Sequence, residues 1–107
     1  MVRDLRCSEL SASLEAADPI ALVDVREDWE VEICAIDGAH HIPLGDLMGR
    51  VGELDPESPV ALLCHHGVRS RHAAIMLEDR GFKHVFNVAG GIDVWALEID
   101  PEMIRYD

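Results

Sequence analysis

Short apolar runs alternate along this chain with segments whose apolar residues recur at helical spacing. The runs are nearly continuous in apolar character, as is typical of parallel strands covered by helices on both faces. They lie at residues 20–25, 60–63 and 84–88. Helical patterns fill the intervals, at 8–17, 29–36, 70–80 and 92–99. This alternation predicts an α/β layer fold with a mainly parallel sheet.

Several boundaries follow from local chemistry. Ser8 is suited to cap the first helix, and Gly81 to end the helix at 70–80. Residues 29–36 fit a helix or a strand, and we interpret them as the helix that a parallel crossover needs. A short strand is expected at 40–42. A further helix, weakened by two glycines, is expected at 47–54.

Length and charge limit the number of domains and the kinds of partner that the chain can have. With 107 residues, the chain is expected to form one domain over 1–107. No apolar run approaches the roughly 18 residues of a membrane span. The first residues lack the apolar core of a signal peptide, so a cytoplasmic location is expected. The formal net charge of −12 argues against nucleic acid or a membrane as partner.

The most informative local feature is Cys64, which lies where an apolar strand ends and a helix begins. Backbone N–H groups converge there, and the helix dipole favours a thiolate and hence reactivity. The chain has three cysteines, too few for a closed disulfide framework, and their spacing matches no zinc pattern. Cys7 and Cys34 are expected to be ordinary packed side chains.

Four segments in order resemble a single-domain rhodanese. They are Asp24-Val25-Arg26-Glu27, Gly38-Ala39-His40-His41-Ile42-Pro43-Leu44, Cys64-His65-His66-Gly67-Val68-Arg69-Ser70 and Asn87 to Trp95 with its Gly-Gly-Ile motif. Together they cover most of residues 20–97. The tail 99–106 is similar to that of small bacterial members with a Cys-His-His-Gly loop.

The resemblance implies a rhodanese-like five-stranded sheet flanked by helices, with Cys64 at the bottom of a shallow cup. It also implies sulfane-sulfur transfer. Cys64 would take sulfur from a small donor such as thiosulfate, form a persulfide, and pass the sulfur to cyanide or a thiol. No cofactor or metal is needed, because the cysteine carries the sulfur.

The remaining loop residues are candidates for substrate binding: His65, His66, Gly67, Val68, Arg69 and Ser70. Arg69 could neutralise an anion or pair with Asp24 or Glu27. Ser70 is expected to cap the helix rather than to touch substrate. The two histidines would supply only partial positive charge near neutral pH.

Other candidates are better explained by structure. His40 and His41 are neighbours in a strand and cannot both bind one metal ion, so no metal site is expected. Trp29 and Trp95 are expected in the core. Asp24, Arg26 and Glu27 end a strand at the edge that carries Cys64, where a structural ion pair is expected.

Three other functions compete with a free-standing sulfurtransferase. A persulfide carrier that delivers sulfur to a partner protein would use the same residues. A non-catalytic interaction module is disfavoured by the intact Cys64 loop. A phosphatase of the same fold would need one more residue between the cysteine and the arginine. The four residues between Cys64 and Arg69 match the shorter sulfur-handling loop.

Overall fold

The structure, a computed structural model, describes residues 1–107. All neighbouring strands of its five-stranded sheet are parallel, in the order β1-β5-β4-β2-β3. The strands are β1 (Arg3–Leu5), β2 (Ala21–Asp24), β3 (His40–His41), β4 (Val60–Leu63) and β5 (Val85–Val88). The predicted α/β fold with a five-stranded, mainly parallel sheet is confirmed. Its three apolar runs form the three inner strands, the positions that are buried on both faces.

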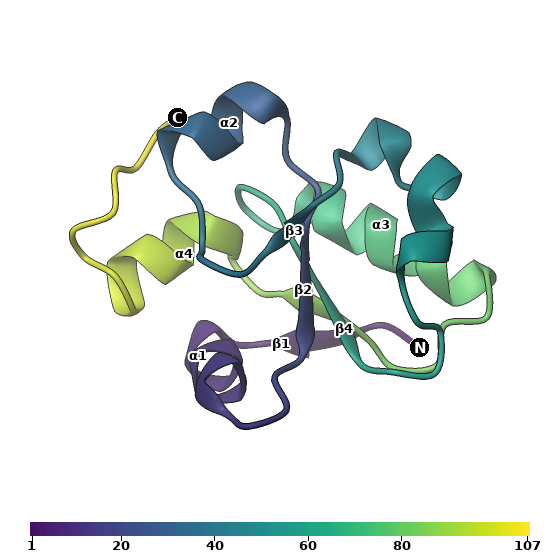
Figure 1. Ribbon diagram of the computed structural model, residues 1–107. Helices are drawn as coiled ribbons and strands as arrows, with labels where there is room; N and C mark the ends of the chain where they lie inside the picture. Colours follow the sequence, from purple (N-terminus) through teal and green to yellow (C-terminus); the bar gives the residue numbers. More distant parts are fainter.

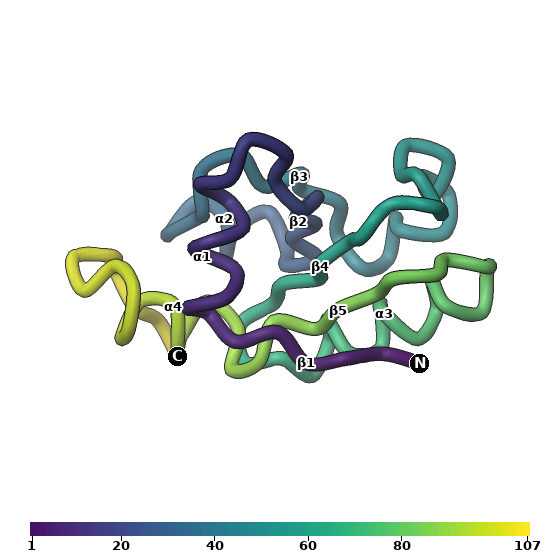
Figure 2. Tube along the Cα trace, turned by 90° about the horizontal axis from the view of Figure 1, so that it is seen from below, coloured from purple at the N-terminus to yellow at the C-terminus, as the bar shows by residue number.

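Helices cover both faces of the sheet (Figures 1 and 2). They are α1 (Cys7–Glu15), α2 (Asp28–Ile33), α3 (Val68–Asp79) and α4 (Gly91–Glu98), with two 3-10 helices, η1 (Leu44–Asp46) and η2 (Met48–Glu53). The segment expected to be a weak helix thus forms 3-10 turns, because its glycines lower the propensity for a continuous α-helix. No helix has the length and apolar character needed to cross a membrane.

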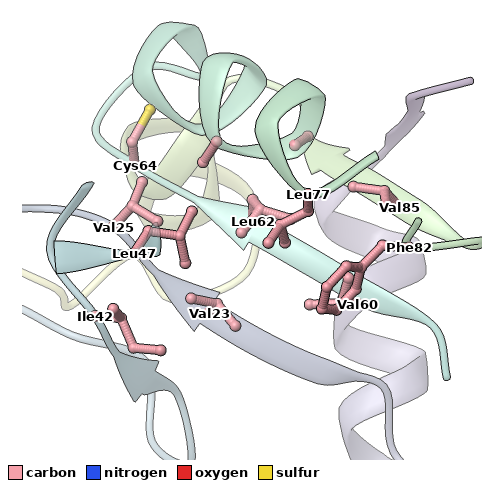
Figure 3. Close-up of a cluster of buried hydrophobic side chains, with 12 residues drawn as sticks. Val23, Val25, Ile42, Leu47, Val60, Leu62, Cys64, Leu77, Phe82 and Val85 are labelled. Atoms are coloured by element: carbon pink, nitrogen blue, oxygen red, sulfur yellow. The ribbon is translucent and has the colours of Figure 1, made fainter. Parts of the chain in front are cut away.

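The core has one apolar layer on each side of the sheet, and β4 contributes to both. Val60 and Leu62 pack with α3 in one layer, whereas Ala61 and Leu63 pack with α1 and α4 in the other. Cys64 lies on the same side of the sheet as Val60 and Leu62, at one end of that layer (Figure 3). The alternation of side chains along a strand therefore directs the cysteine toward α3.

Two local predictions are wrong. The first helix begins at Cys7, and its N-cap is Arg6, whose backbone N–H donates to the Glu9 carboxylate at 2.9 Å. Ser8 is therefore inside the helix and does not cap it. Trp29 is 55% exposed, because α2 turns that side of its short helix to solvent. Trp95, in contrast, is buried in the core as expected.

Candidate active site at Cys64

Cys64 follows the central strand β4 directly, at the carboxyl edge of the sheet. Open α/β sheets bind ligands at this edge. The chain then reverses into α3, whose N-cap Gly67 has φ +104°. Glycine adopts this left-handed conformation without the steric cost that a Cβ brings. The loop 64–70 is therefore a tight strand-to-helix turn around the cysteine.

The Cys64 sulfur accepts a hydrogen bond from one amide of a loop whose other amides are unpaired. The residue is 1% exposed, and the Gly67 N–H donates to Sγ at 3.0 Å. Other amides of the loop donate to no acceptor within the protein, namely those of His65, His66, Val68, Arg69 and Ser70. The first amides of a helix lack intrahelical partners and favour negative charge. This turn is accordingly built to hold an anion at or beside the sulfur.

The Ser70 hydroxyl contacts the Cys64 sulfur and is itself hydrogen-bonded to Asn87. The Ser70 hydroxyl oxygen is 3.2 Å from Cys64 Sγ and 2.5 Å from Asn87 Oδ1. The Asn87 Nδ2 amide donates to the Gly67 carbonyl at 3.1 Å, which leaves Oδ1 to face the serine. Because the hydroxyl has one hydrogen, it can accept from a Cys64 thiol while donating to Asn87, or rotate to donate to a thiolate.

The start of α4 holds the other side of the loop. The Ile92 N–H donates to the Cys64 carbonyl at 2.9 Å, and the Asp93 N–H donates to the His65 carbonyl at 3.2 Å. This approach is possible because residue 91 is glycine. A Cβ at Gly91 would lie 2.6 Å from the Cys64 carbonyl oxygen, and its φ is +62°. The Gly-Gly motif thus permits close contact between α4 and the cysteine loop.

Arg69 pairs with Glu30 of α2 through both carboxylate oxygens, at 2.5 and 2.7 Å. Asp24 pairs instead with Arg26, which confirms the structural ion pair expected there. The partners considered for Arg69, Asp24 and Glu27, were therefore wrong. Burial acts to raise the pKa of Glu30, but hydrogen bonds from Arg69 and Tyr106 lower it to about 2. The Arg69 charge is thus neutralised by a fixed carboxylate.

The remaining candidates differ sharply in exposure. The His65 ring is buried, at 9% exposure, and stacks on His66 and Tyr106, whereas His66 and Val68 face solvent. Burial lowers the pKa of His65, and the neighbouring His66 lowers it further. Of the two histidines, only His66 presents its side chain to an approaching solute.

The other two cysteines lie apart from this amide turn. Cys7 is buried under α4, and burial, with a smaller effect of Glu98, raises the pKa of its thiol to about 11. Cys34 is half-buried, with its sulfur 3.9 Å from an Arg26 nitrogen. No group of three His, Cys, Asp or Glu side chains is placed to share a metal ion.

Three residues of the site carried no functional prediction: Glu30, Asn87 and Tyr106. Asn87 offered a signal, since a polar residue inside a buried strand needs hydrogen-bond partners. Glu30 and Tyr106 offered none, because their partners are 39 and 76 residues away in the sequence.

The fold and the site together define an α/β domain with a parallel sheet and a buried cysteine in a loop of unpaired amides at its carboxyl edge. Comparison with known proteins gives this class a family. Residues 7–98 match the model of the rhodanese-like domain. The chain belongs to the rhodanese-like family.

Relatives and solved structures agree with this assignment. The chain is 35% identical to YtwF of Bacillus subtilis, a protein provisionally named as a sulfurtransferase, over 94% of the chain and 97% of YtwF. It is 33% identical to YrkF of the same organism, provisionally named as a sulfur carrier protein, over 88% of the chain and 51% of YrkF. The crystal structure of a rhodanese-like domain protein from Staphylococcus aureus superposes with a TM-score of 0.84 at 27% identity. That superposition covers 98% of this chain and 99% of the other.

Proposed function

We propose that this protein is a thiosulfate sulfurtransferase in which Cys64 carries the transferred sulfur as a persulfide. The observation that carries the proposal is the position of the Cys64 sulfur within a turn of unpaired amides. Such amides stabilise a thiolate before reaction and the negative outer sulfur after it. Membership of a family of sulfurtransferases and sulfur carriers supports the same chemistry.

The reaction has two displacements. The Cys64 thiolate attacks the outer sulfur of thiosulfate, the S–S bond of thiosulfate breaks, and sulfite leaves with the electron pair. An acceptor, cyanide or a thiolate, then attacks the outer sulfur of the persulfide. The S–S bond to Cys64 breaks and the thiolate returns. No net oxidation of the enzyme occurs, so no redox cofactor takes part.

A second candidate is a carrier that delivers the persulfide sulfur to a partner protein. The similarity to YrkF favours it, because that protein is named for carrying sulfur. The same Cys64 persulfide would form, and only the acceptor would differ. The partner would have to reach a cysteine of 1% exposure, and the outer sulfur of a persulfide projects further than the thiol itself.

A phosphatase function is disfavoured by Arg69 as well as by loop length. Both carboxylate oxygens of Glu30 bind the terminal nitrogens of this guanidinium. A phosphate would have to displace that carboxylate to gain bidentate contact with the arginine. We therefore expect no phosphatase activity above that of a Cys64→Ser variant.

Intact mass spectrometry tests the persulfide directly. After incubation with thiosulfate, the wild type should gain about 32 Da on Cys64, and cyanide should remove it. A Cys64→Ser variant should gain nothing. A Cys7→Ser variant is the matched control and should load normally, because the Cys7 thiol remains protonated in the core. Absence of the adduct from the wild type, or its presence on the Cys64→Ser variant, contradicts the proposal.

The acceptor is tested after loading. The loaded protein is mixed with cyanide, with a small thiol or with a protein thiol, and loss of the adduct is timed. Fast release to cyanide and small thiols supports a free-standing enzyme. Release to a protein thiol alone supports the carrier.

A further inference from the structure

Tyr106 joins the C-terminal segment to the Cys64 loop through its ring. The ring lies parallel to His65, with centroids 3.9 Å apart and an interplanar angle of 12°. His66 stacks on His65 at 3.9 Å and 30°, and Trp29 meets Tyr106 edge-on at 5.9 Å. In Figure 1 the yellow C-terminal segment runs from the end of α4 to the level of α2. The imidazole at the start of the loop is therefore covered by a residue from the far end of the chain.

The Tyr106 hydroxyl is linked to Arg69, near the other end of the loop, through Glu30. It donates to Glu30 Oε2 at 2.7 Å and accepts from Arg26 Nη1 at 3.2 Å. Glu30 in turn binds Arg69 through both oxygens. Arg26 is itself fixed by the carboxylate of Asp24, with an Nη2 to Oδ2 distance of 2.7 Å. One phenol thus contacts a carboxylate and a guanidinium that are both immobilised by ion pairs.

We infer that Tyr106 is a positioning residue for the Cys64 loop, holding His65 through its ring and Arg69 through its hydroxyl and Glu30. These two residues lie on either side of Gly67, whose N–H donates to the sulfur. Holding both therefore holds the backbone of the loop between them. The consequence for sulfur transfer rests on the function proposed above, whereas the consequence for the loop itself does not.

A tyrosine suits both tasks because its ring and hydroxyl act separately. His65 Nε2 is buried without a hydrogen-bond partner, and the ring is held by its stack on Tyr106 and by a hydrogen bond with the Tyr106 backbone. Phenylalanine would keep that stack. It would remove one hydrogen-bond donor from Glu30 and one acceptor from Arg26, and both groups are buried. Leucine would remove the stack and the hydrogen bonds together.

Two variants separate the tasks. Tyr106→Phe should keep His65 covered. It should slow the reaction of Cys64 with iodoacetamide and its loading by thiosulfate by about 2- to 10-fold, because the two lost hydrogen bonds act on the loop only through Glu30 and Arg26. Tyr106→Leu should slow both by about tenfold or more. Arg105→Ala is the control in the same segment. It removes an exposed ion pair with Asp93 and should leave both rates unchanged.

An NMR titration of the His65 imidazole provides a readout independent of sulfur transfer. Its pKa is lowered by burial and by His66, against smaller opposing effects of a hydrogen bond with the Tyr106 backbone, which both variants keep, and of Asp93 and Glu30. In Tyr106→Leu the pKa should rise toward the ordinary value of about 6.5, whereas in Tyr106→Phe it should stay low. A thermal melt shows that each variant is folded. If Tyr106→Leu does not fold, the rate of Cys64 alkylation in Tyr106→Phe still tests whether Tyr106 positions the loop.

Two results overturn the inference. One is a His65 titration that is the same in the wild type and in a folded Tyr106→Leu variant. The other is an alkylation rate of Cys64 that is unchanged in Tyr106→Phe. If the wild type forms no persulfide, the proposed function fails, and the titration and alkylation still test Tyr106.

Discussion

The Ser70 hydroxyl oxygen lies 3.2 Å from the sulfur of Cys64, inside the first turn of α3. Ser70 was expected to cap the helix, but this prediction is wrong. Gly67 is the N-cap, and α3 begins at Val68, two residues before the serine. Ser70 therefore contacts the candidate nucleophile directly. Its second contact, with Asn87, ties the sulfur to strand β5.

Replacing Ser70 should slow the chemistry of Cys64. Ser70→Ala removes a hydrogen bond to a group that becomes charged, worth about 1.5–3 kcal/mol, so sulfur loading should slow by about 10- to 100-fold. It also leaves Asn87 Oδ1 without the serine donor in a buried site, so the melting temperature should fall. Ser8→Ala, at an exposed serine in α1, is the control and should change neither quantity. A loading rate equal to wild type in Ser70→Ala would falsify this role.

The contact between α4 and the loop predicts a large effect at Gly91. Gly91→Ala places a Cβ against two backbone carbonyls and forces alanine into a left-handed conformation. Gly38→Ala is the matched control. It has φ +86° and nothing within 4 Å of the added Cβ, so only the conformational cost of about 1–2 kcal/mol applies.

Denaturant unfolding of the two glycine variants measures the difference. We expect the free energy of unfolding of Gly91→Ala to fall by more than the about 1–3 kcal/mol that overpacking usually costs. Sulfur transfer should also be lost. Equal losses of stability in both variants would show that the close approach of α4 is unimportant.

The low pKa of Glu30 predicts how stability depends on pH. Since the pKa falls from its ordinary value of 4.5 to about 2 on folding, the unfolded chain binds the proton more tightly. The stabilisation is thus complete above pH 4.5 and is lost as the pH falls toward 2. The difference in free energy of unfolding between the wild type and Glu30→Gln should shrink over this range. A difference that stays constant from pH 6 to pH 3 would contradict the proposed ion pair.

Exposed charge beside the loop should control the affinity for thiosulfate. The net charge of −12 opposes a dianion, and Arg69 is neutralised by Glu30. We therefore expect a KM for thiosulfate in the millimolar range or above, at or beyond the weak end of the common range of about 1 μM–1 mM.

Adding charge at His66 tests this explanation. His66→Arg should lower the KM because the residue faces solvent. His65→Arg should not lower the KM, because it disrupts the stack of His65 on Tyr106. A micromolar KM in the wild type, or no improvement in His66→Arg, would show that the surface charge does not limit binding.

The inner strands and the cysteine turn were predictable because their signals are local. Continuous apolar runs identify buried strands, and a cysteine followed by Gly-x-Arg-Ser identifies the turn. Strand β1 was missed because a three-residue edge strand containing Arg3 and Asp4 has no apolar run. Its identity depends on pairing with β5, more than 80 residues away.

The residues that contact the Cys64 loop from other elements were less predictable, because their contacts also join distant parts of the sequence. The pairing of Arg69 with Glu30 depends on where α2 lies relative to the loop, which the local pattern does not determine. Tyr106 carried no local signal, although its ring stacks on His65 and its hydroxyl donates to Glu30, the partner of Arg69. Trp29 was assigned to the core on residue type alone, but the short α2 leaves it exposed.

The pairing of β1 with β5 also sets an order for biosynthesis. Among the five strands of this sheet, β1 is synthesised first, and its only neighbour in the sheet, β5, is synthesised last. Residues 3–5 must therefore wait unpaired until residues 85–88 emerge, and closing such a distant contact is slow. The nascent chain can assemble β2, β3 and β4 first. The sheet is completed only after residues 85–88 have emerged.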